Sequence, residues 1–60
     1  MDKTFLTSKE TADYLGLTIK SLYSVVQKGQ IRAYRPNGKK LLFKKEELDD
    51  WVVRSVVNNL

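Results

Sequence analysis

Residues 16–18, Gly-Leu-Thr, form a helix boundary so short that it limits the folds open to this chain of 60 residues. Before it, Thr7 and Glu10 stand at the spacing of a capping box, which predicts a helix over about residues 8–15. The glycine ends that helix, because it adopts a positive φ without the steric cost of a Cβ atom. Thr18 is a suitable N-cap for a second helix, so the sequence predicts two short helices that meet at a tight corner.

The second predicted helix, which Gly29 ends, has two unlike faces. At about 100° per residue, its apolar face consists of Leu22, Val25 and Val26. Its opposite face is polar, has no acid, and consists of Lys20, Ser24 and Gln27. Such side chains reach base edges and phosphates in a major groove, so we interpret the helix pair as a DNA-reading helix-turn-helix. An ordinary corner of two helices, without a nucleic-acid role, is the alternative.

Basic residues are concentrated in the middle of the chain. The net charge is +4, but residues 20–45 carry eight basic groups and no acid, whereas residues 46–60 carry one basic and four acidic groups. This segregation favours a polyanion as partner. Turn signals within the basic segment favour nucleic acid over a membrane surface, which would need one continuous amphipathic face.

Residues 31–44 predict a β-hairpin beside the two helices. Pro36-Asn37-Gly38 is a strong turn signal, because Pro fixes φ and the next two residues, Asn and Gly, tolerate the backbone angles of a tight turn. The apolar face of the hairpin, expected to lie on the helices, consists of Ile31, Ala33, Leu41 and Phe43. Cations stand at or beside the tip, at Arg35, Lys39 and Lys40. We interpret the hairpin as a wing for a phosphate backbone or minor groove, with a solubilising basic hairpin as the alternative.

The segment from Lys45 onward predicts a closing helix, because four acids suit the N-terminus of a helix. The side of this helix that faces the core is expected to carry Leu48, Trp51 and Val52. A neighbouring apolar stripe consists of Val53, Val57 and Leu60. That stripe is wider than one small core needs, so it either pairs with another chain or packs against residues 1–6.

Composition excludes several classes of function. The chain has no Cys and no His, which removes thiol chemistry and the commonest metal ligand and general base. Asp49 and Asp50 are adjacent carboxylates, but neighbouring helical positions point about 100° apart and no nucleophile or base accompanies them. We therefore expect no enzyme, no cofactor and no metal. Without a long apolar run or a signal-peptide pattern, we expect one cytoplasmic, nucleoid-associated domain over residues 1–60.

With these elements in order, the sequence resembles the excisionase-type, MerR-like winged helix-turn-helix family. The resemblance runs from Phe5 to about Val52. It includes residues 6–17 for the first helix and turn, 21–23 and 28–31 for the second helix, 33–39 for the wing and 43–51 for the closing helix. The implied fold is α+β, mainly α, with two short helices, a β-hairpin wing and a C-terminal helix.

The resemblance implies a small DNA-binding protein of a mobile element or phage that binds near an attachment site and directs a recombinase towards excision. Because members also regulate transcription, a small MerR-like regulator is one alternative. A protein-interaction adaptor that docks on a recombinase or regulator is the alternative from another class. The expected partners are double-stranded DNA, an integrase or recombinase, and a second copy of the chain on DNA, but no membrane.

Ten residues are expected to contact DNA: Thr18, Lys20, Ser21, Tyr23, Ser24, Gln27, Lys28, Arg35, Lys39 and Lys40. We expect Lys20, Ser24 and Gln27 to enter the major groove, while the others position the helix and the wing on phosphates. Tyr23 has two interpretations, a DNA contact or a ring packed beside Val26. The expected surface for a protein partner consists of Val53, Val57 and Leu60.

Overall fold

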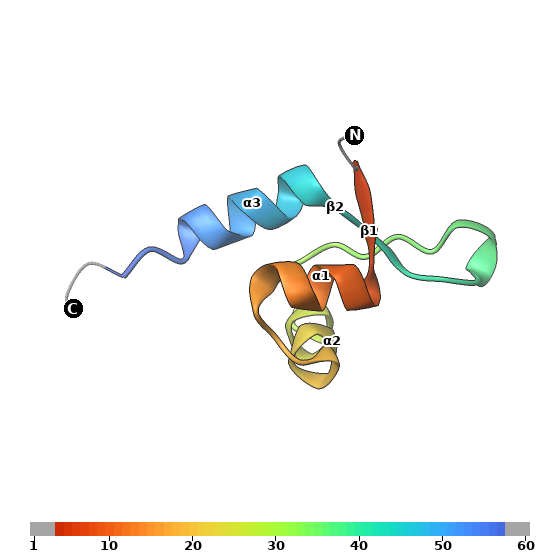
Figure 1. Cartoon of the computed structure of the whole chain (residues 1–60), viewed down its shortest axis with the longest axis horizontal. Helices are drawn as coiled ribbons and strands as arrows, with labels where there is room; N and C mark the ends of the chain where they lie inside the picture. The colour runs from red at the N-terminus through yellow and green to blue at the C-terminus, as the bar shows by residue number, and fades with distance from the viewer. Residues whose placement is uncertain (1–3, 58–60) are drawn as a thin grey trace.

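The structure is a computed structural model that describes residues 4–57. Its elements are, in order, β1 (Phe5–Thr7), α1 (Ser8–Leu15), α2 (Ile19–Gln27), the 3-10 turn η1 (Pro36–Gly38), β2 (Leu42–Lys44) and α3 (Lys45–Arg54). Within the described range, three helices and a two-stranded antiparallel sheet make a mainly helical fold. The predicted fold class, a winged helix-turn-helix, is confirmed. Figure 1 shows the strand pair at the centre, with α3 and the loop that carries η1 projecting from it in opposite directions.

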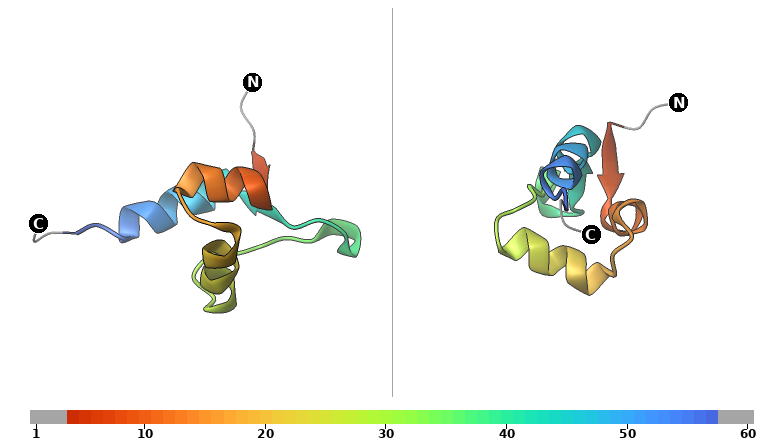
Figure 2. Two further views of the ribbon diagram at one scale, coloured as in Figure 1. Left: turned by 60° about the horizontal axis from the view of Figure 1, so that its bottom comes forward. Right: turned by 90° about the vertical axis from the view of Figure 1, so that its left-hand side faces the viewer.

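Both predicted boundaries of α1 are confirmed. The Thr7 hydroxyl accepts a hydrogen bond from the Glu10 N–H at 3.2 Å, and the Glu10 carboxylate accepts one from the Thr7 N–H at 3.0 Å. Gly16 ends the helix with φ +70°, and the next N–H, that of Leu17, donates to the Ala12 carbonyl at 2.8 Å. The chain thereby turns sharply into α2. In the right-hand view of Figure 2, α1 is seen end-on while α2 is seen from the side, so the two helices cross steeply.

The pairing of the strands differs from the predicted hairpin. β2 pairs with β1, in the register Phe5↔Lys44, Leu6↔Phe43 and Thr7↔Leu42. The two arms of the wing meet at a single bridge, Tyr34↔Leu42, instead of along a regular ladder. β2 therefore has a partner on each edge: β1 on one side, where Leu6 lies opposite Phe43, and Tyr34 on the other. Extending the Tyr34 bridge in register would place Arg32 directly opposite Lys44, and like charges at facing positions are destabilising.

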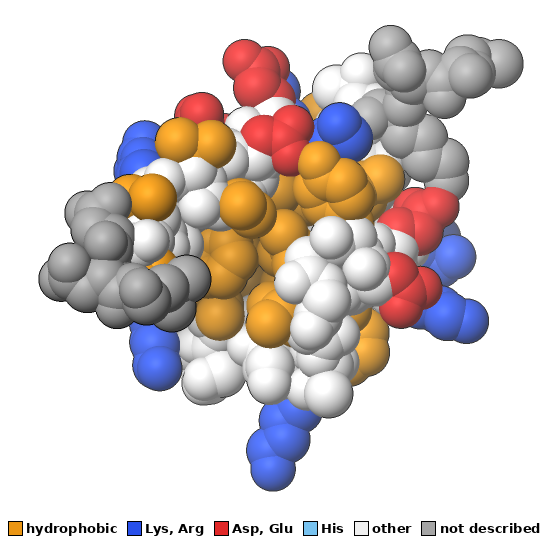
Figure 3. Space-filling model, turned by 60° about the vertical axis from the view of Figure 1, so that its left-hand side comes forward, with side chains coloured by type: hydrophobic (Ala, Val, Ile, Leu, Met, Phe, Trp, Pro, Cys, Tyr) orange, Lys and Arg blue, Asp and Glu red, His pale blue; other side chains and the backbone are white. Residues whose placement is uncertain are grey.

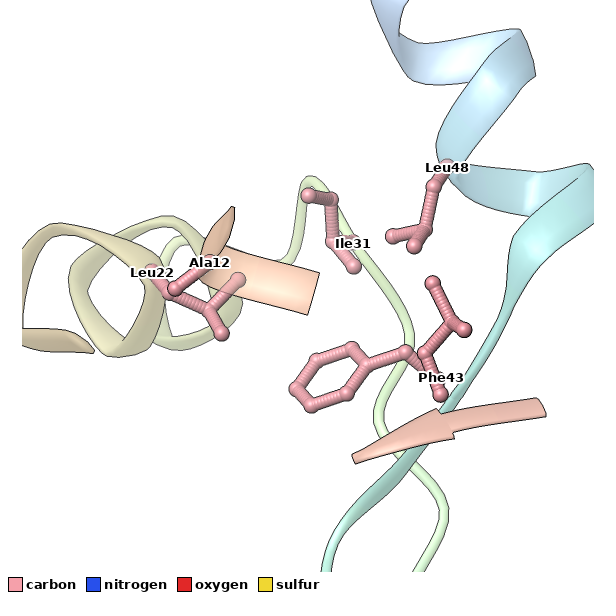
Figure 4. Close-up of a cluster of buried hydrophobic side chains, with 6 residues drawn as sticks. Ala12, Leu22, Ile31, Phe43 and Leu48 are labelled. Carbon is pink, nitrogen blue, oxygen red and sulfur yellow. The ribbon is translucent and has the colours of Figure 1, made fainter. Parts of the chain in front are cut away.

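Every helix and both strands contribute to one small core. It consists of Leu6, Ala12, Leu22, Ile31, Phe43 and Leu48, all less than 9% exposed. In Figure 4 the Phe43 ring points from β2 towards the helix pair, and Leu48 points from α3 towards the same centre. Burial of a large apolar side chain stabilises a fold by roughly 1.5–3 kcal/mol, so the few members of this core fix how the helices, the wing base and α3 are arranged.

Polar contacts hold the first turns of α3 against α1. The Tyr14 hydroxyl donates to one carboxylate oxygen of Asp49, and the other carboxylate oxygen lies 3.6 Å from the Lys45 ammonium. The same ammonium lies 5.2 Å from the centre of the Tyr14 ring. The charge of Asp49, and after it Tyr14, raises the pKa of Lys45 above its ordinary value. Asp49, one of the two adjacent carboxylates in the sequence, therefore helps to hold α3 against α1.

α3 is shorter than the apolar stripe in the sequence indicates. It ends at Arg54, and Ser55 is its C-cap. The Ser55 hydroxyl donates to the Trp51 carbonyl at 2.9 Å, a local bond that competes with continuation of a helix. The next residues, Val56 and Val57, are β-branched and exposed, so neither propensity nor burial favours a further turn.

The predicted stripe on α3 does not pack against the start of the chain as far as the structure describes it. Val53 is 72% exposed and Val57, beyond the helix end, is 63% exposed. Neither is covered by residues 4–6. Leu60, the third member of the stripe, lies outside the described residues. Val52, expected on the core side, is 49% exposed.

Candidate nucleic-acid interface

α2 is held with its polar face outward, as the sequence predicts. The Thr18 hydroxyl caps the helix by accepting a hydrogen bond from the Ser21 N–H at 3.1 Å. Leu22 is fully buried, and Val25 and Val26 are half-buried against the core. The opposite side chains, Lys20, Ser24 and Gln27, are exposed.

α2 forms one side of an open groove of about 990 Å³, and the start of α1 and the wing form the others. We call it the basic groove. It is lined by Thr7, Ser8, Lys9, Lys20, Tyr23, Ser24, Val26, Gln27, Arg35, Lys39, Lys40 and Leu41. Seven of the ten predicted DNA contacts are among these residues: Lys20, Tyr23, Ser24, Gln27, Arg35, Lys39 and Lys40. The fold thus brings the polar face of α2 and the cations of the wing to one surface, although they are distant in the sequence.

The charge of the basic groove has one sign. Among the lining side chains that the structure describes, five are cations, Lys9, Lys20, Arg35, Lys39 and Lys40, and none is an acid. The four acids of residues 46–50 belong to α3, which projects away from the wing (Figure 1). Cations gathered in a concave surface raise the local concentration of an anionic partner. The groove is therefore suited to a polyanion.

The turn at the wing tip has the geometry that Pro36-Asn37-Gly38 predicts. The Gly38 N–H donates to the Arg35 carbonyl at 3.1 Å, which closes the turn. Asn37 has φ +60° and Gly38 has φ +66°, values that most residues with a Cβ atom avoid. The turn holds Arg35 at its start and Lys39 just after it, so both cations stay at the tip.

Tyr23 lies in the wall of the basic groove and has a hydrogen-bond partner in α1, Ser8, that the sequence does not suggest. It lines the basic groove and is 42% exposed, so part of its ring is open to a partner. Its hydroxyl donates to the Ser8 hydroxyl oxygen at 3.2 Å. The side chain therefore bridges α2 and the first turn of α1 while it forms part of the groove wall.

Three predicted contacts lie outside the groove lining. Thr18 and Ser21 are joined to each other at the start of α2, where the Thr18 hydroxyl also donates to the Ser21 hydroxyl oxygen at 3.0 Å. Lys28 is the C-cap of α2, at its other end. All three are exposed, so they remain predicted contacts at the two ends of the helix.

The sequence does not predict the contribution of α1. Ser8 and Lys9 line the groove because the first turn of α1 lies beside Tyr23, a tertiary contact between residues 15 positions apart. The basic character of Lys9 and its place just after the capping box are visible in the sequence. Its proximity to α2 depends on how the two helices cross.

Apolar side chains are exposed on another part of the molecule. Figure 3 shows hydrophobic side chains gathered on the face towards which the end of α3 points, with acidic and basic side chains around them. Exposed apolar residues of α3 and the segment after it are Val52, Val53, Val56 and Val57. Two of them, Val53 and Val57, belong to the surface predicted for a protein partner.

In residues 4–57, no group of three or more His, Cys, Asp or Glu side chains is placed to hold a metal ion. Among the helices of the same range, none is long and apolar enough to cross a membrane.

Comparison with protein families gave one result. The model of the helix-turn-helix domain family matches residues 5–54. That range contains every element from β1 to α3 and the whole of the basic groove. Comparison with curated proteins and with solved structures gave no match.

Proposed function

Since the chain belongs to the helix-turn-helix domain family, a DNA-binding family that includes excisionase-like proteins, we propose that it binds a specific sequence of double-stranded DNA through the basic groove. One observation carries this proposal. In the described part of the chain, five cations and no acid line a single groove, and the polar face of the second helix of the helix-turn-helix forms one of its sides. Phosphate neutralisation would supply affinity there, and the adjacent polar side chains would supply specificity.

In the proposed mechanism α2 enters the major groove. Lys20 and Gln27 donate hydrogen bonds to acceptors on base edges, while Ser24 contacts either a base or a phosphate. The wing then lies on the neighbouring backbone, where Arg35, Lys39 and Lys40 pair with phosphates. Thr18, Ser21 and Lys28, at the two ends of α2, hold the helix in register through flanking phosphates.

A role in recombination is the finer part of the proposal. The resemblance of the sequence to excisionase-type proteins supports a chain that directs a recombinase towards excision. The same arrangement of α2 and wing suits a small transcriptional regulator. An excision assay with an integrase encoded beside the gene would separate the two, because a regulator would leave the ratio of excision to integration unchanged.

A second copy of the chain on DNA is part of the same proposal. One small reading helix recognises few base pairs, so repeated sites and contact between bound copies would increase specificity. The exposed Val53 and Val57 supply apolar surface for that contact.

The salt dependence of affinity tests the electrostatic core of this proposal. If the groove and the ends of α2 neutralise about six phosphates, log K falls with log salt concentration with a slope of about −5. A slope near zero for a duplex of about 20 base pairs would refute it.

A further inference from the structure

Tyr34 connects the base of the wing to three other elements. Its backbone forms the bridge to Leu42 of β2. The nitrogen-to-oxygen distances are 2.8 Å from Tyr34 to Leu42 and 2.6 Å from Leu42 to Tyr34. Its ring meets the Phe5 ring of β1 edge-on, with centres 6.2 Å apart and planes at 79°. Its hydroxyl lies 2.9 Å from each carboxylate oxygen of Glu47 in α3 and donates to that carboxylate. No other described residue of the wing is joined to β1, β2 and α3 together in this way.

The wing beyond Tyr34 has few other connections. Within the described chain, residues 35–41 form the Arg35–Gly38 turn, and no backbone hydrogen bond joins them to another element. Their three cations are exposed, and Leu41 is the half-buried apolar side chain that packs against the core. The direction in which the wing leaves the molecule is therefore set at its base.

Two of the four acids of α3 are half-buried, and each accepts a tyrosine hydroxyl: Asp49 from Tyr14 of α1, and Glu47 from Tyr34 at the base of the wing. Glu46 and Asp50 are exposed. A hydrogen bond to a charged group is shorter and stronger than one between neutral groups. The bond joins α3, which is anchored in the core by Leu48, to the residue that immediately precedes Arg35.

We propose that Glu47 is a positioning residue for the wing: through Tyr34 it sets where Arg35, Lys39 and Lys40 stand relative to α2. This inference rests on the proposed function for its effect on DNA binding. With the bond in place, the wing cations meet the phosphate backbone while α2 is in the major groove. Without it, the wing samples other directions, and DNA binding has to restrict that motion at a cost in affinity.

DNA affinity gives the first test. Tyr34→Phe keeps the ring and removes the hydroxyl, and Glu47→Ala removes the acceptor. Each should weaken binding about tenfold, the effect of one charge-assisted hydrogen bond. Glu47→Gln retains an acceptor oxygen and should stay closer to the unsubstituted protein. Glu46→Ala is the matched charge control: it removes an exposed acid from the same helix turn, so binding should be unchanged or slightly stronger.

A double-mutant cycle distinguishes positioning from general damage to the fold. In a chain that already carries Lys39→Ala and Lys40→Ala, Tyr34→Phe should have little further effect, because the cations that it positions are mostly gone. An equal tenfold loss in both backgrounds would overturn the proposal, since Tyr34 would then act on binding independently of the wing.

Backbone order in the free protein gives a readout that does not depend on DNA. In Tyr34→Phe and Glu47→Ala, amide order parameters of residues 35–41 should fall while those of α1 and α2 stay unchanged. Unchanged order in the wing would overturn the proposal. If the unsubstituted protein bound no duplex, the proposed function would fail, and this measurement alone would decide whether Glu47 positions the wing.

Discussion

The Tyr23 hydroxyl of α2 donates a hydrogen bond to the Ser8 hydroxyl oxygen of α1 across 3.2 Å. This bond links the helix expected to read DNA to the first turn of the helix that supports it. Because Tyr23 is 42% exposed, water can replace much of what the bond contributes. The bond therefore adds little to the stability of the fold, although both of its partners line the basic groove.

Removing either partner should have a small and equal effect on stability. Tyr23→Phe and Ser8→Ala should each lower the free energy of unfolding by about 0.5–1 kcal/mol, the net contribution of one hydrogen bond. The double variant should lose no more than either single one, because both changes delete the same bond. Urea denaturation followed by circular dichroism measures all three. If the double variant lost the sum of the two single losses in free energy of unfolding, the two hydroxyls would act independently.

The wing cations should contribute affinity without sequence preference. Replacing Lys39 and Lys40 together with Ala should weaken binding to every duplex alike and make the salt slope shallower by about 2, because two phosphate contacts are lost. The matched control is Arg32→Ala with Arg54→Ala, which removes the same charge from exposed residues outside the basic groove. Equal effects of the two pairs would mean that only net charge matters.

Substitutions on α2 should instead change which sequence is preferred. Lys20→Ala or Gln27→Ala should cost about 1–3 kcal/mol at one base pair and much less elsewhere. Lys9→Ala is the contrast, because α1 would contact only phosphates and its loss should be uniform. Affinities for a panel of duplexes, each with one base pair changed, measure both. A uniform loss for the α2 variants would contradict base readout by that helix.

Thr11 offers a prediction about stability alone. It is fully buried, and its hydroxyl has no hydrogen-bond partner within residues 4–57. Thr11→Val has nearly the same shape and removes the unpaired group, so it should raise the free energy of unfolding by about 1 kcal/mol. Thr7→Ala, which removes the cap of α1, should lower it by about the same amount. Thermal melts compare the two variants. A lower melting temperature for Thr11→Val than for the unsubstituted protein would contradict the conclusion that the buried Thr11 hydroxyl is unpaired.

The exposed valines should matter for contacts between bound copies. Val57→Asp should leave affinity for a single site unchanged and reduce the cooperativity of binding to repeated sites. Band shifts on one-site and two-site duplexes, together with sedimentation of the free protein, measure this. A strict monomer whose cooperativity is unaffected by Val57→Asp would rule out this surface.

Local signals in the sequence predict much of the fold. The Thr7–Glu10 capping box, the ends of α1 and α2 and the turn at Pro36-Asn37-Gly38 all form as expected. Each depends on hydrogen bonds or backbone angles within a few residues, so the determining groups are neighbours in the chain. The two faces of α2 follow in the same way from helical periodicity.

What the sequence does not predict depends mostly on contacts between residues that are distant in the chain. β2 meets residues 5–7 on one edge and Tyr34 on the other, and the regular ladder forms on the edge that brings Leu6 opposite Phe43 rather than on the edge where Arg32 would face Lys44. The run Phe5-Leu6-Thr7 has the β-branched and aromatic character of a strand, which is a signal that could have been used. The place of Lys9 in the basic groove likewise depends on packing that periodicity does not show, whereas the early end of α3 has local causes in Ser55 and the β-branched residues after it.

The most direct test of DNA binding through the basic groove is a titration at near-physiological salt. An unlabelled duplex of about 20 base pairs is added to labelled protein, and the chemical shift of each backbone amide is followed. DNA binding through the basic groove predicts shifts at residues 8–9, 20–28 and 35–40, which lie along the basic groove and the ends of α2. Shifts confined to residues 51–57, or no shifts at all, would contradict DNA binding through this groove. They would favour instead an adaptor that docks on another protein through α3.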